Sequence, residues 1–306
     1  MTLSIVRLAE RLLDEGSTHE QLTNTCAELY DVFARAGGFD STDLAAANAA
    51  ACLLDTNRTV AFVRGLWAAI RDAQRRFPGA VVEVVYAGTG PFASLATPLM
   101  PLLSPRDVRF TLIEVNARSI TSLETLLETL RLTPHVGRIV HGDATCYRHS
   151  TPIHVAVTET MQRALSREPF VAVAQNLKGQ LAVGGLLVPQ RVAITAAAID
   201  AELEKARWNG ATTTVAHRPL ARLIEISSSE VCSAPVVVTF PDADGREYWI
   251  GLLTEIATFG SERLRCYDSG LTMPDIIWPL SPMIGGETVE FRYRISASPG
   301  IEWRRF

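Results

Sequence analysis

Short apolar segments that alternate with helical segments constrain the fold of this chain more than any other feature. The apolar runs are four to six residues long and end at glycine or acidic residues, as buried strands do. The predicted strands are Val81–Tyr86, Phe110–Val115, 137–141 and His154–Val157, and the predicted helices between the first three are 92–103 and 117–130. Strands separated by helices of this length are typical of βαβ units. We therefore predict an α/β domain with a doubly wound parallel sheet.

The regions on either side have other periodicities. Residues 1–78 carry apolar side chains at helical spacing and predict a helical N-terminal region, in which Asp43 caps an alanine-rich helix. Beyond Pro189 this spacing fades, and strand-like runs separated by turn residues predict an antiparallel, β-barrel-like domain. The predicted C-terminal strands are Val192–Ala198, Leu223–Ile226, Pro235–Phe240, Tyr248–Glu255 and Thr288–Ser296. We expect three parts, at 1–78, 79–189 and 190–306.

Composition bears on the compartment and on several classes of partner. The 306 residues include 29 basic and 33 acidic side chains, for a formal net charge of −4, which predicts no broad surface for nucleic acid. No run reaches the ~18 apolar residues of a membrane span. The five cysteines are scattered and form no CxxC-like pair. We expect a cytoplasmic protein with no metal site and no membrane partner.

The first predicted strand runs into a glycine-containing loop, Ala87-Gly88-Thr89-Gly90-Pro91. Glycine lets the backbone turn sharply and approach a ligand closely, and open α/β sheets bind ligands at the carboxyl ends of their strands. Phe92 stands where many dinucleotide-binding loops have a third glycine, which disfavours a pyrophosphate ligand. By itself the pattern also fits an ordinary turn between a strand and a helix.

Acidic residues end the next two predicted strands. Glu114, about 25 residues beyond the glycine loop, can accept hydrogen bonds from both hydroxyls of a ribose. Asp143 follows the third strand, where it either reaches an adenine edge or caps the next helix. This order of glycine loop and acids resembles the layout of class I S-adenosylmethionine methyltransferases. We predict S-adenosylmethionine as the cofactor, with an NAD enzyme as the alternative.

The segment after the fourth predicted strand carries Glu159, Met161, Leu165 and Glu168. It resembles the hallmark loop of protein arginine methyltransferases, in which methionine, leucine and a second glutamate follow the first glutamate at this spacing. A guanidinium is planar, stays protonated and only donates hydrogen bonds, so two carboxylates can hold it through charge-assisted pairs. The resemblance implies that Glu159 and Glu168 are catalytic and bind the acceptor, together with Met161.

Three further segments support the resemblance, which covers about residues 39–199. Residues 55–59 match the family's DxxRT motif, Phe39-Asp40-Ser41 resembles the segment before its first active-site helix, and 185–191 resembles its exit into the β-barrel. The implied architecture is a Rossmann-like cofactor domain and a barrel, assembled as a homodimer. Residues 45–51 and 202–209 are candidate contact surfaces for that dimer.

The resemblance also assigns the cofactor-binding residues. Arg58, the arginine of the DxxRT motif, is implied to hold the cofactor carboxylate. Gly88 and Gly90 are implied to pass under the methionine part of the cofactor, and Glu114 to bind the ribose. The remaining contacts, to the adenine, are implied for Asp143 and the Ala144 amide.

The chain departs from the family where the family closes its active site. The segment Ile276-Ile277-Trp278 replaces a Thr-His-Trp motif, so that Trp278 is kept as a substrate contact and the histidine is lost. The paired tyrosines of the first active-site helix are missing; Thr42 and Asp43 fall near one of them, and Cys52 stands at a methionine position. We therefore predict a member of the bacterial small-molecule type that methylates a guanidino nitrogen. Free L-arginine, or an arginine-derived intermediate of natural-product biosynthesis, is the first candidate acceptor.

Two other functions are compatible with the same residues. The carboxylates can accept an N–H of an indole or amine, which predicts methylation of an aromatic natural-product intermediate. A non-catalytic regulator that binds another protein is the second alternative, although such a protein has no use for the spacing of Glu159 and Glu168.

Overall fold

The computed structural model describes residues 2–39, 42–227, 231–232, 234–242 and 244–306. Asp40 and Ser41, part of one segment that carries the family resemblance, lie outside the described residues. The chain divides into two compact units. Unit 1 consists of Met1–Thr160, Ala172–Gln190 and Ala257–Leu264, and unit 2 of Met161–Val171, Arg191–Ile256 and Arg265–Phe306. The helical and sheet regions up to Thr160 thus share one unit, and the three predicted domain ranges stay a prediction.

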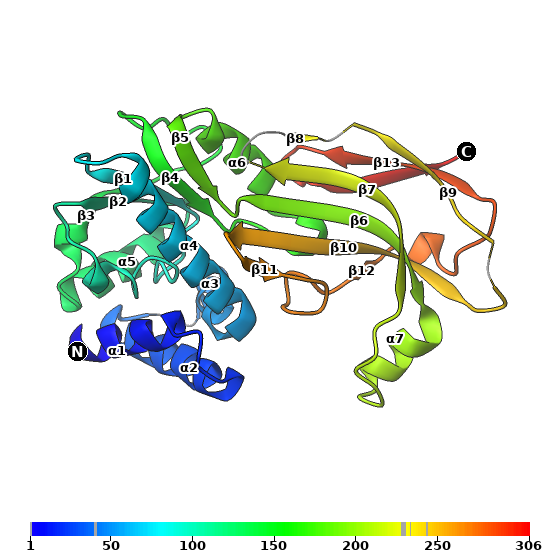
Figure 1. Ribbon diagram of the computed structural model, residues 1–306, viewed down its shortest axis with the longest axis horizontal. Coiled ribbons are helices and arrows are strands. Elements are labelled where there is room, and N and C mark those ends of the chain that lie inside the picture. The colour runs from blue at the N-terminus through cyan, green and yellow to red at the C-terminus, as the bar shows by residue number, and fades with distance from the viewer. Residues whose placement is uncertain (1, 40–41, 228–230, 233, 243) are drawn as a thin grey trace. The chain divides into compact units, whose positions relative to one another are not determined.

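Four helices open unit 1 (Figure 1): α1 (Thr2–Leu13), α2 (His19–Ala36), α3 (Leu44–Ala51) and α4 (Thr56–Arg76). Capping residues define where they begin. Thr18 and Gln21 form a reciprocal capping box at the start of α2, and the Asp43 carboxylate accepts hydrogen bonds from two backbone N–H groups at the start of α3, as predicted. The Asp55 carboxylate caps α4 by accepting a hydrogen bond from the Arg58 N–H. The short 3-10 helix η1 (Cys52–Leu54) joins α3 to α4.

The sheet of unit 1 has five parallel strands in the order β3-β2-β1-β4-β5. The strands are β1 (Val82–Ala87), β2 (Val108–Glu114), β3 (Val136–His141), β4 (Ile153–Thr158) and β5 (Leu181–Val188). The first four confirm the predicted strands to within a few residues, and β5 was not predicted. Helix α4 packs on β1, β4 and β5, whereas α5 (Ala117–Thr129) packs on β2 and β3. Helix α6 (Phe170–Lys178) precedes β5. The strand order reverses between β1 and β4, and in such sheets ligands bind outside the carboxyl ends of the strands at that point.

The predicted helix at 92–103 is wrong. This segment forms a series of turns that ends in the 3-10 helix η2 (Met100–Leu102). Ala93 has a φ of 44°, and Pro98 and Pro101 lack the N–H groups that a continuous α-helix needs. The apolar spacing of the segment nevertheless places its side chains in the core, because Phe92, Leu95 and Leu99 are buried.

The sheets of the C-terminal region are antiparallel, as predicted. One follows the order β11-β10-β6-β7-β8, with β12 paired to β10, and the other the order β14-β13-β9. Their strands are β6 (Arg191–Asp200), β7 (His217–Ser227), β8 (Val231–Cys232), β9 (Val236–Thr239), β10 (Tyr248–Phe259), β11 (Glu262–Leu264), β12 (Asp275–Ile276), β13 (Thr288–Arg294) and β14 (Gly300–Arg305). Helix α7 (Ala201–Trp208) lies between β6 and β7 (Figure 1). The remaining 3-10 helices are η3 (Thr133–His135), η4 (Arg163–Leu165) and η5 (Trp278–Leu280). Within the described ranges, no helix is both long and apolar enough to cross a bilayer.

Candidate functional site

The loop after β1 is shaped by its two glycines. Gly88 has a φ of 73° and Gly90 a φ of 59°, in the left-handed region that favours glycine. A Cβ on Gly88 would lie 2.2 Å from the Thr160 Cγ2 atom, and one on Gly90 would lie 3.1 Å from the Ala49 Cβ atom. The loop therefore has room for backbone only at these positions.

The Glu114 carboxylate holds this loop in place. Glu114 is 8% exposed at the end of β2. Its Oε2 accepts a hydrogen bond from the Gly90 N–H at 2.8 Å, and its Oε1 accepts from the N–H groups of Val115 and Asn116 at 2.9 and 2.8 Å. A carboxylate has about four acceptor positions, and these three bonds leave about one for a further donor. Sequence reasoning placed Glu114 at the site but did not predict that it organises the glycine loop.

Thr89, between the two glycines, carries a buried hydroxyl that sequence reasoning did not single out. The residue is 3% exposed, and its Oγ1 has no hydrogen-bond partner among the described residues. Leaving a buried hydroxyl unpaired costs about 1–3 kcal/mol. Its position, as a polar residue between the two glycines of the loop, could have identified Thr89 from the sequence.

Arg58 and Glu159 form a buried ion pair. The Arg58 Nε donates to the Glu159 Oε1 at 2.5 Å, and the two side chains are only 13% and 7% exposed. Arg58 lies in the first turn of α4, and Glu159 follows β4, whose last residue, Thr158, pairs with Ala87 at the end of β1. Burial by itself lowers the pKa of Arg58, but the adjacent Glu159 carboxylate more than offsets this and holds the pKa above its usual value. The topology thus brings the pair to the same sheet edge as the glycine loop.

Asp143 and Ala144 follow β3 at the same carboxyl edge. Asp143 is exposed, and its Oδ1 accepts a hydrogen bond from the Thr145 N–H at 2.8 Å, so the side chain closes a turn. Ala144 is buried, and its carbonyl accepts from the Asn176 Nδ2 at 2.9 Å. The neighbouring strand ends are in register, because Glu114 pairs with His141.

The second glutamate lies on a loop of unit 2, whereas Glu159 belongs to unit 1. Glu168 is half-buried, and its Oε1 accepts a hydrogen bond from the Gln162 Nε2 at 3.0 Å. Met161, at the start of this loop, is 2% exposed. Three residues of the loop that are not glycine have a positive φ: Ala164, Leu165 and Arg167, at 55°, 53° and 67°. Such a conformation is costly for residues that carry a Cβ, and it clusters at functional sites.

Trp278 lies in a cluster of three tryptophans in unit 2. Its ring centroid is 5.0 Å from that of Trp249 and 6.3 Å from that of Trp208 on α7, and its side chain is 55% exposed. Ile277 stands at the position that the resemblance gives to the family's histidine; it is half-buried, and its backbone N–H donates to the Ile250 carbonyl at 2.8 Å. Ile276, at the threonine position, packs against an apolar cluster from β6 and β10. The histidine position is therefore occupied by an aliphatic side chain, which offers no hydrogen bond to a carboxylate.

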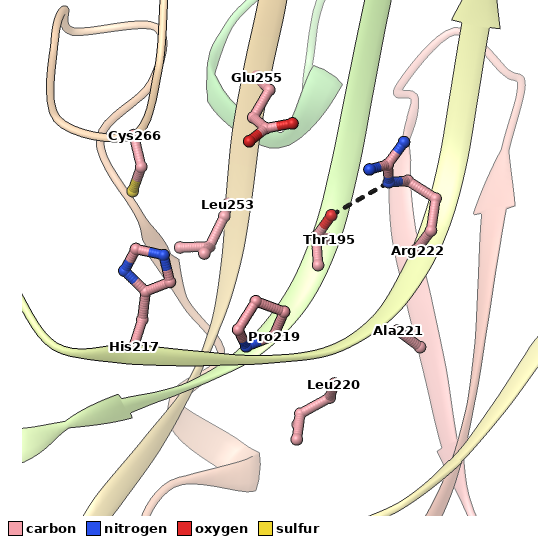
Figure 2. A pocket seen from close by; sticks show the side chains of 9 residues that line it. All are labelled: Thr195, His217, Pro219, Leu220, Ala221, Arg222, Leu253, Glu255 and Cys266. Carbon is pink, nitrogen blue, oxygen red and sulfur yellow. Dashed lines mark hydrogen bonds between the residues drawn. The ribbon is translucent and has the colours of Figure 1, made fainter.

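A pocket of about 330 Å³ lies on unit 2, between β6, β7, β10 and the segment after β11 (Figure 2). It is lined by Thr195, His217, Pro219, Leu220, Ala221, Arg222, Leu253, Glu255 and Cys266. Burial raises the pKa of the Cys266 thiol to about 12, so this thiol is protonated at neutral pH. Of the described residues that line the pocket, none is a predicted site residue. Among the described side chains, no group of three or more that could hold a metal ion comes together.

Comparisons with known proteins show which solved structure has a similar fold. No protein-family model matches the chain, and no curated protein matches it. A solved structure that it resembles is the PRMT1 enzyme–prozyme heterotetrameric complex of Trypanosoma brucei with AdoHcy. The two chains are 12% identical, the match covers 83% of this chain and 96% of the other, and the TM-score is 0.53. At this identity the likeness establishes the architecture: a helical N-terminus, a Rossmann-like sheet and C-terminal antiparallel sheets.

Proposed function

We propose that the protein is an S-adenosylmethionine-dependent N-methyltransferase that acts on a guanidino nitrogen of a small molecule, with free L-arginine as the first candidate. The observation that carries the proposal is the buried pair of Arg58 and Glu159 beside the glycine loop. In this pair, Arg58 is the residue implied to bind the cofactor carboxylate, and Glu159 is one of the two residues implied to bind the acceptor. The fold shared with an AdoHcy-bound arginine methyltransferase supports the same function.

The residues around the glycine loop fit this cofactor. The backbone at Gly88 and Gly90 leaves a surface without side chains, and the unpaired Thr89 hydroxyl offers a buried polar contact. Glu114 has about one acceptor position for a ribose hydroxyl. In the proposal Arg58 holds the carboxylate, and Asp143 and the Ala144 amide bind the adenine. Bound there, S-adenosylmethionine would supply an electrophilic methyl group on its sulfonium.

The acceptor is held by Glu159 and Glu168 in this proposal. Two carboxylates that share the donors of one guanidinium would fix the attacking nitrogen and favour positive charge on the rest of the group. A lone pair on the attacking nitrogen then becomes available. Such alignment and electrostatic stabilisation lower a barrier by several kcal/mol. Met161 and Trp278 remain proposed substrate contacts.

One observation favours the alternative acceptor, an indole or amine of a natural-product intermediate. Ile277 stands where the resemblance places the family's histidine, and its aliphatic side chain cannot make a histidine contact to a carboxylate. An acceptor with a single N–H needs one carboxylate only. A non-catalytic regulatory role is the least favoured function, because it gives no reason to bury the Arg58–Glu159 pair.

The decisive experiment compares Glu159→Gln and Glu168→Gln at saturating S-adenosylmethionine, with methylated products identified by mass spectrometry. The panel contains free L-arginine, other guanidines, an indole and a primary amine, and Glu124→Gln on the exposed side of α5 is the matched control. A guanidinium acceptor predicts losses of ~10²-fold or more in both variants. One severe and one nearly silent substitution would instead indicate the indole or amine. Cofactor binding without turnover on any acceptor would revive the regulator.

We also propose that the protein is a homodimer. Support comes from the family resemblance and from the similar solved structure, which is described as a heterotetrameric complex. Helix α7 and the alanine-rich helix α3 are the proposed contact surfaces. Light scattering at micromolar concentration tests this, and a monomer would reject the dimer while leaving the catalytic proposal intact.

A further inference from the structure

The loop of residues 161–168 is strained and is held by residues from both antiparallel sheets. Ala164, Leu165 and Arg167 all have a positive φ, which costs roughly 1–2 kcal/mol for each such residue. Ala164 and Leu165 are 2% and 0% exposed. A loop with this much local strain keeps its conformation only when contacts from elsewhere in the fold determine it.

Two buried side chains make those contacts. The Thr254 Oγ1 on β10 accepts a hydrogen bond from the Ala164 N–H at 2.9 Å. The Tyr293 hydroxyl on β13 donates to the Leu165 carbonyl at 2.9 Å. Thr254 and Tyr293 are 0% and 5% exposed, so water cannot readily replace either partner.

Two weaker contacts complete the hold. The Arg167 N–H donates to the Pro299 carbonyl at 3.0 Å, between β13 and β14. The Arg163 side chain lies 3.8 Å from the Asp275 carboxylate, and both side chains are about half exposed, so this pair contributes little. The backbone of the loop is therefore fixed mainly by the two buried hydroxyls.

We infer that Thr254 and Tyr293 are positioning residues, which hold the 161–168 loop in its strained conformation and thereby place Glu168. This inference rests on the proposed function in so far as Glu168 binds the acceptor. Neither residue touches the reacting atoms. Sequence reasoning could not single them out, because both occupy buried positions of ordinary strands.

The test uses four single substitutions in the full chain. Thr254→Val and Tyr293→Phe each remove one hydroxyl with little change of shape, and Thr254→Ser restores the hydroxyl. Thr258→Val is the matched control for the threonine, since the buried Thr258 hydroxyl on the same strand donates to the Ala61 carbonyl instead. Tyr267→Phe is the control for the tyrosine, whose hydroxyl donates to Glu204.

Limited trypsin digestion under native conditions measures the opening of the 161–168 loop without requiring any enzymatic activity. Arg163 and Arg167 have exposed side chains within the loop, so cleavage after them reports local opening of the backbone. Mass spectrometry identifies the fragments that begin at Ala164 and Glu168. We expect cleavage to be about tenfold faster in Thr254→Val and Tyr293→Phe, because each leaves a buried backbone group unpaired. The Ser variant and both controls should resemble the wild type.

Methyl transfer supplies the second measurement. Both test variants should lose about tenfold or more in kcat, with unchanged affinity for S-adenosylmethionine, and Thr254→Ser should recover activity. Equal cleavage in test and control variants would overturn the inference, as would faster cleavage with kcat unchanged. A wild-type protein that methylates no acceptor would refute the proposed function alone, and the cleavage rates would then decide whether these residues hold the loop.

Discussion

Replacing Arg58 by methionine tests the buried ion pair more sharply than any other substitution. The change leaves the Glu159 carboxylate, 7% exposed, without its partner at 2.5 Å. Removing one member of a buried pair typically costs 3–5 kcal/mol, because the remaining charge is desolvated and uncompensated. We therefore expect Arg58→Met to lower the free energy of unfolding by about 4 kcal/mol.

The double variant tests whether the charge left on Glu159 causes the loss of stability in Arg58→Met. Arg58→Met combined with Glu159→Gln leaves no net charge in the site, although it buries an amide. We expect the double variant to be about 2 kcal/mol more stable than Arg58→Met alone, because a buried amide that has lost its Arg58 partner costs less than a buried carboxylate that has lost it. The two substitutions are therefore strongly non-additive.

Urea unfolding followed by circular dichroism, without cofactor, measures this cycle, provided that the m-values agree among the variants. The pair of Arg75 and Asp72 on α4, whose arginine side chain is 75% exposed and whose aspartate is 18% exposed, supplies the control cycle. Its coupling should be below about 0.5 kcal/mol. If the double variant were no more stable than Arg58→Met, the remaining charge would not be what destabilises the single variant, and the prediction would be refuted.

Three further predictions concern the sheet of unit 1. Glu114→Ala should weaken S-adenosylmethionine binding by ~1.5–3 kcal/mol in titration calorimetry, because it unpairs a ribose hydroxyl and frees the glycine loop; an unchanged affinity would mean that Glu114 does not contact the ribose. Gly88→Ala should reduce cofactor affinity at least tenfold, since its Cβ would lie 2.2 Å from Thr160 Cγ2, whereas the same change at Gly79, where nothing lies within 4 Å, should cost only backbone strain. Burial lowers the pKa of His149 and of His154 in the folded protein. Below the ordinary histidine pKa of ~6.5, the unfolded chain therefore binds more protons than the folded protein. Stability should therefore fall as the pH drops below that value. His149→Gln should reduce the change in the urea midpoint between pH 7 and pH 5.

Local signals were enough to predict much of the fold. The alternation of apolar strands and helices determined the parallel sheet, and Asp43 determined where α3 begins. These features depend on neighbours within a few residues, whose spacing and capping chemistry can be recognised in the sequence. The segment at 92–103 shows the limit of that reasoning, since its apolar spacing is helical while Pro98 and Pro101 prevent a continuous helix.

The sequence by itself placed Arg58, Gly88, Glu114 and Glu159 at the candidate site, through glycine loops, strand ends and a recognisable motif. Only the tertiary structure decided what they contact. The Arg58–Glu159 pair joins residues 101 positions apart, and the Glu114 bond to Gly90 joins the end of β2 to the loop after β1. Pairings of this kind depend on strand order and register, which bring distant segments to one sheet edge. No local pattern encodes them, because the burial that makes each bond strong arises only when the whole core has formed.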